Sequence, residues 1–240
     1  MTLSLWLLEA LWAALLFGGF LFGKPHDDAA YRMPTATRMA SSLVLVVASA
    51  VAAWLAHRAP APLASAMTGV ALGMTLGFIG DLALAGWLGR ASSTLTGMAA
   101  FGGGHLCYIA ALWHVAQPLA LGNATAWIAS FVIWAVVAVV GWYAVVWRGS
   151  DATVLHRAAL PYALLLASTA AMATAVAVQW SAAWSVALGA AMFLISDLVL
   201  AGRLFGGLSF PLIGDVVWLL YGPGQALIVF GMAALLLGGG

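Results

Sequence analysis

Long apolar stretches separated by short polar breaks run from one end of the chain to the other. A helix needs about 20 mostly apolar residues to cross a hydrocarbon core of ~30 Å. Runs of this length without polar alternation are helices rather than the strands of a membrane barrel. The pattern therefore predicts an all-α integral membrane protein, a single transmembrane domain over residues 1–240 with no room for a soluble domain. Its eight predicted membrane-spanning helices cover roughly Leu3–Phe22, Ala36–Ala56, Leu63–Ala85, Thr94–Trp113, Asn123–Trp147, Val154–Val178, Ala183–Ala201 and Ile213–Leu237.

The composition supports this class and excludes several others. Hydrophobic residues make up 65% of the chain and charged residues only 6%, whereas about a quarter of a soluble domain is charged. A net charge of +1 excludes an electrostatic nucleic-acid binder, which needs a basic surface. The single cysteine, Cys107, excludes a disulfide framework and a cysteine-built metal site. The first stretch carries Glu9 and follows no basic residue, so we expect a retained helix rather than a signal peptide.

The basic residues predict the orientation of the helices. Seven of the eight lie in or beside the first, third, fifth and seventh connections: Lys24, Arg32, Arg38, Arg90, Arg148, Arg157 and Arg203. The other connections and both termini hold only Arg58. Because basic residues favour the cytoplasmic side, we expect those four connections in the cytoplasm and both termini outside it, in a bacterial inner membrane. Asp27, Asp28 and Asp151 share the same connections.

Two segments of the chain are similar to each other. A shift of 116 residues aligns Val70–Leu88 with Val186–Leu204, with eleven of nineteen positions identical. Asp81 and Asp197 are equivalent in this alignment, and acidic residues are rare in such helices. The similarity predicts two parallel four-helix repeats, roughly residues 1–118 and 119–240, related by an axis normal to the membrane.

Six polar side chains lie within the predicted spans at corresponding depths. An ionisable residue inside the membrane is costly unless it is paired or hydrated, which makes it a candidate for function. We expect one polar cavity, open toward the cytoplasm, to hold all six: Asp81, His105, Tyr108, Asp197, Tyr221 and Gln225. Each could also have a structural role, His105 as a hydrogen-bonding partner and the tyrosines as packing residues.

Other polar or small residues have simpler interpretations. Asp215, at the start of the last span, is placed where a carboxylate favours the positive end of the helix dipole. Glu9 lies in the opposite half of the bilayer from the six. Gly69, Gly73 and Gly77 follow a four-residue step that is typical of close helix packing.

Three kinds of chemistry are compatible with the six residues. Two carboxylates across a cavity of low dielectric can share acid and base roles, as hydrolysis through a cationic intermediate requires. Asp81, His105 and Asp197 could instead ligate zinc, although zinc sites usually hold more than one imidazole. Buried acids at one depth of a repeat are also found in proton-coupled transporters. We expect the first, with no metal and no cofactor.

These residues also resemble the YhhN-like family, the lysoplasmalogenases. The resemblance covers the third, fourth, seventh and eighth predicted spans. One difference is at the start of the second span, where the family has Lys-Pro and this chain has Arg38 without a proline. The matching positions are Gly80, Asp81, Phe101, Gly104, His105, Tyr108, Leu188, Gly189, Ala190, Phe193, Ser196, Asp197, Tyr221 and Gln225.

The resemblance implies hydrolysis of the vinyl ether bond of lysoplasmalogens, which releases a fatty aldehyde and glycerophosphoethanolamine or glycerophosphocholine. In that reaction we expect Asp81 and Asp197 to be catalytic, while His105, Tyr108, Tyr221 and Gln225 bind or orient the substrate. The partners are then a lysophospholipid substrate and membrane lipid, with the phosphate beside Arg38, Arg90 or Arg203. The sequence leaves open which aspartate is the acid, which lipid is preferred, whether a metal is bound, and the oligomeric state.

Overall fold

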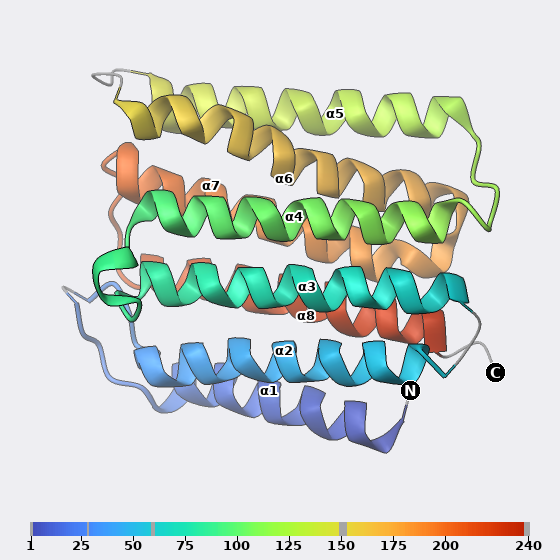
Figure 1. Cartoon of the computed structure of the whole chain (residues 1–240). Helices are drawn as coiled ribbons and strands as arrows, with labels where there is room; N and C mark the ends of the chain where they lie inside the picture. The colour runs from blue at the N-terminus through green and yellow to red at the C-terminus, as the bar shows by residue number, and fades with distance from the viewer. Residues whose placement is uncertain (1, 28, 59–60, 149–152, 238–240) are drawn as a thin grey trace.

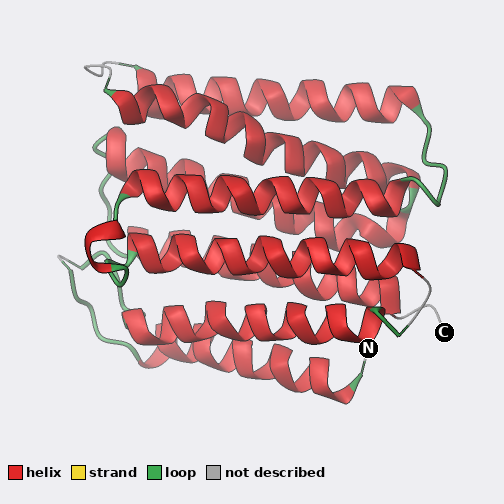
Figure 2. Cartoon of the chain, in the orientation of Figure 1, coloured by secondary structure: helices red, strands yellow, loops and turns green. Residues whose placement is uncertain are grey.

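The computed structural model describes residues 2–27, 29–58, 61–148 and 153–237, without the side chains of 61–63. The described residues form eight helices of membrane-spanning length and no β-strand, so the all-α membrane fold is confirmed (Figure 2). Asp28 and Asp151, expected in connections, lie outside these residues. The helices are α1 (Leu3–Phe22), α2 (Thr35–Ala56), α3 (Ala61–Leu84), α4 (Thr94–Ala116), α5 (Ala124–Trp142), α6 (Val154–Gln179), α7 (Trp184–Phe205) and α8 (Ile213–Leu237).

Helix boundaries follow the polar breaks, and the largest difference from the sequence prediction is at the end of α7. The Ser93 and Asn123 side chains accept hydrogen bonds from backbone N–H groups in the first turns of α4 and α5, which satisfies donors that a helix leaves unpaired. Helix α5 continues into a π-helical turn, Tyr143–Trp147. Helix α7 passes the predicted end at Ala201 and reaches Phe205. Gly202 lies inside the helix and packs closely against the side chains of Leu208 and Val145.

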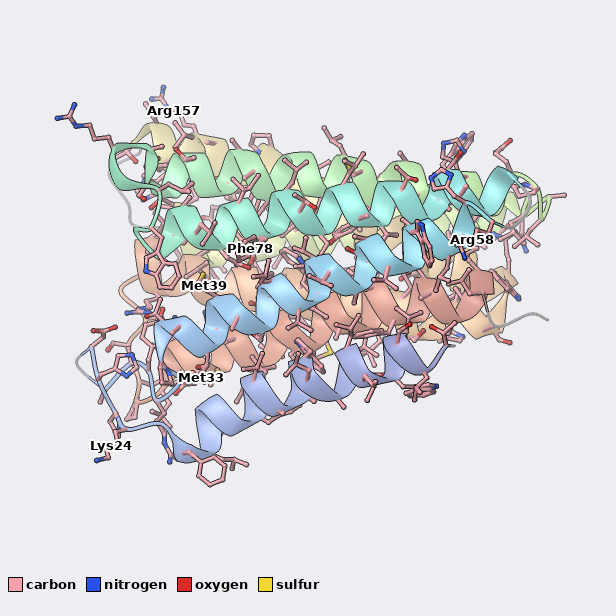
Figure 3. The ribbon with its side chains drawn as sticks, turned by 60° about the horizontal axis from the view of Figure 1, so that its bottom comes forward. Lys24, Met33, Met39, Arg58, Phe78 and Arg157 are labelled. Atoms are coloured by element: carbon pink, nitrogen blue, oxygen red, sulfur yellow. The ribbon has the colours of Figure 1, made fainter. Side chains whose placement is uncertain are left out.

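Successive helices run in opposite directions, so the connections alternate between the two ends of the bundle (Figure 1). Both termini lie at one end. The connections α1–α2, α3–α4, α5–α6 and α7–α8 lie at the other, which we call the basic end. Figure 3 shows Lys24 and Arg157 there and Arg58 at the opposite end. The alternation required by the predicted topology is therefore present, while its orientation in a membrane remains a prediction.

Close contacts between glycines hold two helix pairs together. A Cβ atom at Gly104 of α4 would lie 2.8 Å from the carbonyl oxygen of Gly73 in α3. One at Gly189 of α7 would lie 2.5 Å from the carbonyl oxygen of Gly224 in α8. Only glycine permits backbones to approach this closely. Gly73 and Gly189 are equivalent under the 116-residue shift, which agrees with the predicted repeat.

Contacts between the two halves follow a similar pattern. Helix α2 packs on α8, and α6 packs on α4, which are equivalent pairs if the halves are repeats. Helix α3 also contacts α8. The C-terminal halves of α3 and α7, which carry Asp81 and Asp197, both lie toward the basic end of this bundle.

Candidate active site

A cavity of about 500 Å³ lies at the basic end of the bundle. Side chains of α2, α3, α4, α7 and α8 line it, and the α1–α2 connection contributes Asp27 and Tyr31. Asp81, Asp197 and Tyr221 are among its lining residues. The two acids expected from the repeat therefore face one space.

Asp81 is held by hydroxyl groups from two other helices. Its side chain, 4% exposed, accepts a hydrogen bond of 2.5 Å from Ser42 Oγ on α2 and one of 2.9 Å from the Tyr221 hydroxyl on α8. A buried carboxylate is costly unless hydrogen bonds replace its hydration. These two bonds supply that replacement and fix the direction in which the carboxylate points.

Asp197 accepts its hydrogen bond from Tyr162 on α6. Sequence reasoning missed both Tyr162 and Ser42. The sequence feature that could have indicated them is a hydroxyl-bearing residue inside an otherwise apolar span. Many such residues only donate to the backbone of their own helix, as Ser168 does to the Leu164 carbonyl. Each acid thus receives a hydroxyl from the helix that precedes its own, α2 for Asp81 and α6 for Asp197.

A chain of hydrogen bonds extends from Asp81 away from the cavity. Gln225 donates to the Tyr221 hydroxyl at 3.4 Å, and the Tyr108 hydroxyl donates to Gln225 Oε1 at 2.8 Å. Tyr108 and Gln225 are fully buried and are not among the cavity's lining residues. The structure therefore places them behind Tyr221, where they can orient its hydroxyl.

His105 lies apart from the two acids. Its Nδ1 is 2.9 Å from Thr169 Oγ1, and its ring packs edge-on against Phe193 with the centroids 4.5 Å apart. The buried Nε2 atom has no hydrogen-bond partner among the described residues. The expectation of one cavity holding all six residues was wrong, because the Phe101, Phe193 and Tyr221 rings pack together beside His105.

The metal alternative also depended on His105. Within the described ranges, no three His, Cys, Asp or Glu side chains are grouped closely enough to hold a metal ion. Asp81 and Asp197 share the cavity, but the imidazole makes its hydrogen bond to α6. The zinc ligand set considered from the sequence is therefore not assembled.

Two arginines, Arg38 and Arg203, line the cavity and both lie close to the Tyr31 ring. The Arg38 Cζ atom is 3.9 Å from the centroid of the Tyr31 ring, and that of Arg203 is 5.0 Å away. Arg203 also donates a hydrogen bond of 2.8 Å to the Tyr31 hydroxyl. Arg38 is only 7% exposed, and its Nε has no partner among the described residues. Among those residues neither arginine forms an ion pair, so this pair of cations can receive an anion.

Three further charged residues considered from the sequence, Asp215, Glu9 and Arg90, lie outside the cavity, whereas Asp27 lines it. Asp215 is in the first turn of α8, and its carboxylate accepts the backbone N–H groups of Arg32 and Met33 at 2.5 and 3.1 Å. It therefore clamps the α1–α2 connection from a position in the first turn of α8, which agrees with the placement expected from the helix dipole. Glu9 and Arg90 are not lining residues.

The cavity thus combines the buried Asp81, the half-buried Asp197, hydroxyl groups that orient both, and two arginines that form no ion pair among the described residues. Such an arrangement can bind an anionic group and transfer protons at a bond held deeper inside. Residues 29–232 match the model of the YhhN family. Comparison with curated proteins gave no match, and comparison with solved structures gave none.

Proposed function

Because this chain belongs to the YhhN family, we propose that it is a membrane-embedded lysoplasmalogenase. It hydrolyses the vinyl ether bond of 1-alkenyl glycerophosphoethanolamine or glycerophosphocholine to a fatty aldehyde and the glycerophospho-base. Lysoplasmalogen hydrolysis is the known activity of that family. The observation that carries the proposal is that Asp81 and Asp197 line one cavity together with Arg38 and Arg203.

Two carboxyl groups are sufficient for this reaction. One, in its protonated form, gives its proton to the alkene carbon remote from the ether oxygen, and an oxocarbenium ion forms. The other, ionised, stabilises this cation and takes a proton from the attacking water. The resulting hemiacetal collapses to the aldehyde and the alcohol. In that collapse the second carboxyl group gives its proton to the leaving ether oxygen. The hemiacetal hydroxyl gives its proton to the first carboxylate, which restores the starting state of both acids.

The neighbouring side chains support this use of the acids. Tyr221 and Ser42 direct the Asp81 carboxylate, and Gln225 and Tyr108 hold Tyr221 in place. We assign these last two residues, with Tyr221, to orientation of the catalytic group rather than to direct contact with the lipid. His105 keeps a positioning role through its contact with Phe193 beside Tyr221.

The head group belongs at the mouth of the cavity. A phosphate between the guanidinium groups of Arg38 and Arg203 would receive charge-assisted hydrogen bonds. Arg90, considered from the sequence, does not line this space and is left out of the proposal.

Aldehyde release by the purified protein in detergent tests the proposal. Asp81→Asn and Asp197→Asn should each lower turnover at least about 100-fold, because general acid–base catalysis contributes 10²–10⁴-fold. Glu9→Gln, which changes an acid outside the cavity, should keep normal turnover and serves as the control. Full activity in either correctly folded aspartate variant would refute the proposal. Hydrolysis in detergent also separates an enzyme from a proton-coupled transporter, whose function requires a sealed membrane.

A further inference from the structure

A third acid, Asp27, lines the polar cavity from the α1–α2 connection. Its carboxylate is mostly exposed, and its Oδ2 atom lies 3.7 Å from His26 Nε2. Arg38 and Arg203 line the same cavity, yet within the described residues neither forms an ion pair with Asp27. The cavity therefore presents, besides its two helical acids, a negative group and two positive groups that do not pair with each other.

Backbone hydrogen bonds hold Asp27 in place. His26 and Tyr31 form an antiparallel bridge with N···O distances of 2.8 and 3.4 Å, and the Ala30 N–H donates to the Asp27 carbonyl at 2.9 Å. Backbone N–H groups around the start of α8 donate to the carbonyl groups of Ala29 and Ala30, both at 2.9 Å. The carboxylate is therefore presented by a segment that is anchored to α8 before any ligand binds.

Tyr31 relates this acid to the two arginines. The His26 ring stacks on the Tyr31 ring with the centroids 5.9 Å apart. The Cζ atoms of Arg38 and Arg203 lie 3.9 and 5.0 Å from the centroid of the same Tyr31 ring. The acid and the two cations thus surround one aromatic side chain, close enough for a small ligand with both charges to contact them together.

The order of charges in the cavity matches the order of groups in the substrate. Asp81 and Asp197 belong to the helices α3 and α7, whereas Asp27 belongs to the connection at the basic end. In a lysoplasmalogen the phosphate lies between the vinyl ether and the cationic end of the head group. With the ether at the helical acids and the phosphate at the arginines, the cationic end reaches the side of Asp27.

The chemistry of the site favours one kind of cation. A carboxylate accepts charge-assisted hydrogen bonds from a primary ammonium group, which has three donors, and none from a trimethylammonium group. Proteins bind quaternary ammonium groups on free aromatic faces. Here the Arg38 Cζ atom lies 3.9 Å from the Tyr31 ring centroid and 5.6 Å from that of Trp218, so a guanidinium group already occupies these two rings.

We propose that Asp27 binds the ammonium end of the head group and makes the protein prefer ethanolamine over choline. This inference rests on the proposed function and deepens it, because it names the head group and the residue that selects it. Asp27 takes no part in proton transfer at the vinyl ether, so its contribution is measured by binding.

Binding of saturated 1-alkyl ether analogues in nanodiscs tests this selection without catalysis, because these lipids have no alkene to protonate. Three analogues share one chain and carry glycerophosphoethanolamine, glycerophosphocholine or glycerophosphoglycerol, the last of which has no cation. The wild-type protein should bind the ethanolamine analogue about fivefold more tightly than either of the others, as an exposed charge-assisted hydrogen bond allows. High salt should reduce this preference because it screens exposed charges.

Asp27→Asn removes the charge and keeps the size of the side chain, and asparagine tolerates the left-handed φ of 50° at this position. Affinity for the ethanolamine analogue should fall about fivefold, and affinity for the choline analogue should fall less than about twofold. The glycerol analogue should bind equally well or more tightly, since no carboxylate then repels its phosphate. Lys24→Gln, at an exposed residue of the same connection that does not line the cavity, is the matched control and should keep the preference.

These outcomes separate the inference from the proposed function. Equal binding of the ethanolamine and choline analogues by the wild-type protein would overturn the assignment of Asp27, as would an equal loss for all three analogues in Asp27→Asn. If that variant does not fold, a wild-type preference that is unchanged by salt overturns it. Selection that depends on Asp27 without any release of aldehyde would leave this inference standing and refute the proposed function alone.

Discussion

Tyr162 donates a hydrogen bond to the carboxylate of Asp197, and it is the only described residue whose side chain does so. The bond joins α6 to α7. Asp197 lines both the polar cavity and an adjoining apolar pocket between α4, α5, α6 and α7, which Tyr162 also lines. Asp81, in contrast, accepts two hydroxyl groups. The orientation of Asp197 therefore depends on one residue.

Removal of this hydroxyl should impair catalysis more than binding. Hydrogen bonds to charged groups contribute about 1.5–3 kcal/mol, so Tyr162→Phe should lower kcat roughly 10–100-fold. KM should change little, because the ring that lines the pocket remains. Tyr143→Phe, at a tyrosine 54% exposed on α5's π-helical turn, is the control. A kcat within twofold of the wild-type value would show that Tyr162 only packs.

The two aspartates should differ in their importance. The alkene carbon that receives the proton is on the chain side of the vinyl ether, and Asp197 is the acid that borders the apolar pocket. We therefore expect Asp197 to be the proton donor and Asp81 to assist water. Asp197→Asn should reduce turnover to background. Asp81→Asn should keep about one hundredth of it, with the solvent deuterium isotope effect of proton transfer to carbon retained. If Asp81→Asn lost more turnover than Asp197→Asn, the roles would be exchanged, with Asp81 as the proton donor.

The arginine pair should act on the phosphate. Arg38→Gln and Arg203→Gln should each raise KM for the phospholipid substrate about tenfold, because a charge-assisted hydrogen bond is lost. A 1-alkenylglycerol, which has no phosphate, should show no such change. Arg58→Gln alters a basic residue at the opposite end of the bundle and provides the control. An equal effect on both substrates would indicate that the arginines only support the fold.

Asp215 should be important for stability rather than for the reaction. It is fully buried and accepts two backbone N–H groups of the α1–α2 connection. Asp215→Asn replaces this charged acceptor at a cost of about 1–3 kcal/mol, which should lower the thermal midpoint in detergent by roughly 2–10 °C. Asp27→Asn changes a carboxylate that is 63% exposed and should leave the midpoint nearly unchanged. Equal midpoints for the two variants would contradict the clamp.

Cysteine labelling in intact cells can establish the orientation. In a Cys107→Ser background, a membrane-impermeant reagent should label Gln117→Cys from outside but label Ser209→Cys only after the membrane is opened. This follows because Ser209 is in the α7–α8 connection at the basic end and Gln117 follows α4 at the other end. The opposite labelling pattern would invert the predicted topology.

The sequence predicted the helices well because hydrophobic length alone determines a membrane span. The sequence also indicated that Asp81 and Asp197 would share a cavity, as they do, because acidic residues are rare in this chain and the two are equivalent in the repeat. Ser42 and Tyr162 were missed because their role can be recognised only when the neighbouring helices are known. Their role depends on α2 lying beside α3 and α6 beside α7, and nothing in a single apolar span specifies its neighbour.

The separation of His105 from the cavity was equally beyond the sequence. His105 lies four residues after Phe101 on α4, so the two side chains share a face of the helix. The spacing alone does not show whether that face contacts water or aromatic rings. The rings of Phe193 and Tyr221, from two other helices, decide the matter. Tertiary packing therefore determines which of the polar residues line the cavity.

The adjoining polar and apolar spaces also bear on what happens after cleavage. Their shared wall at Asp197 would leave the two products on different sides of the broken bond, the aldehyde among lipid-facing helices and the glycerophospho-base among charged groups. Each fragment can then move into the phase in which it is soluble. Under the proposed function the two products could therefore leave by separate routes, and neither would have to pass through the space that holds the other.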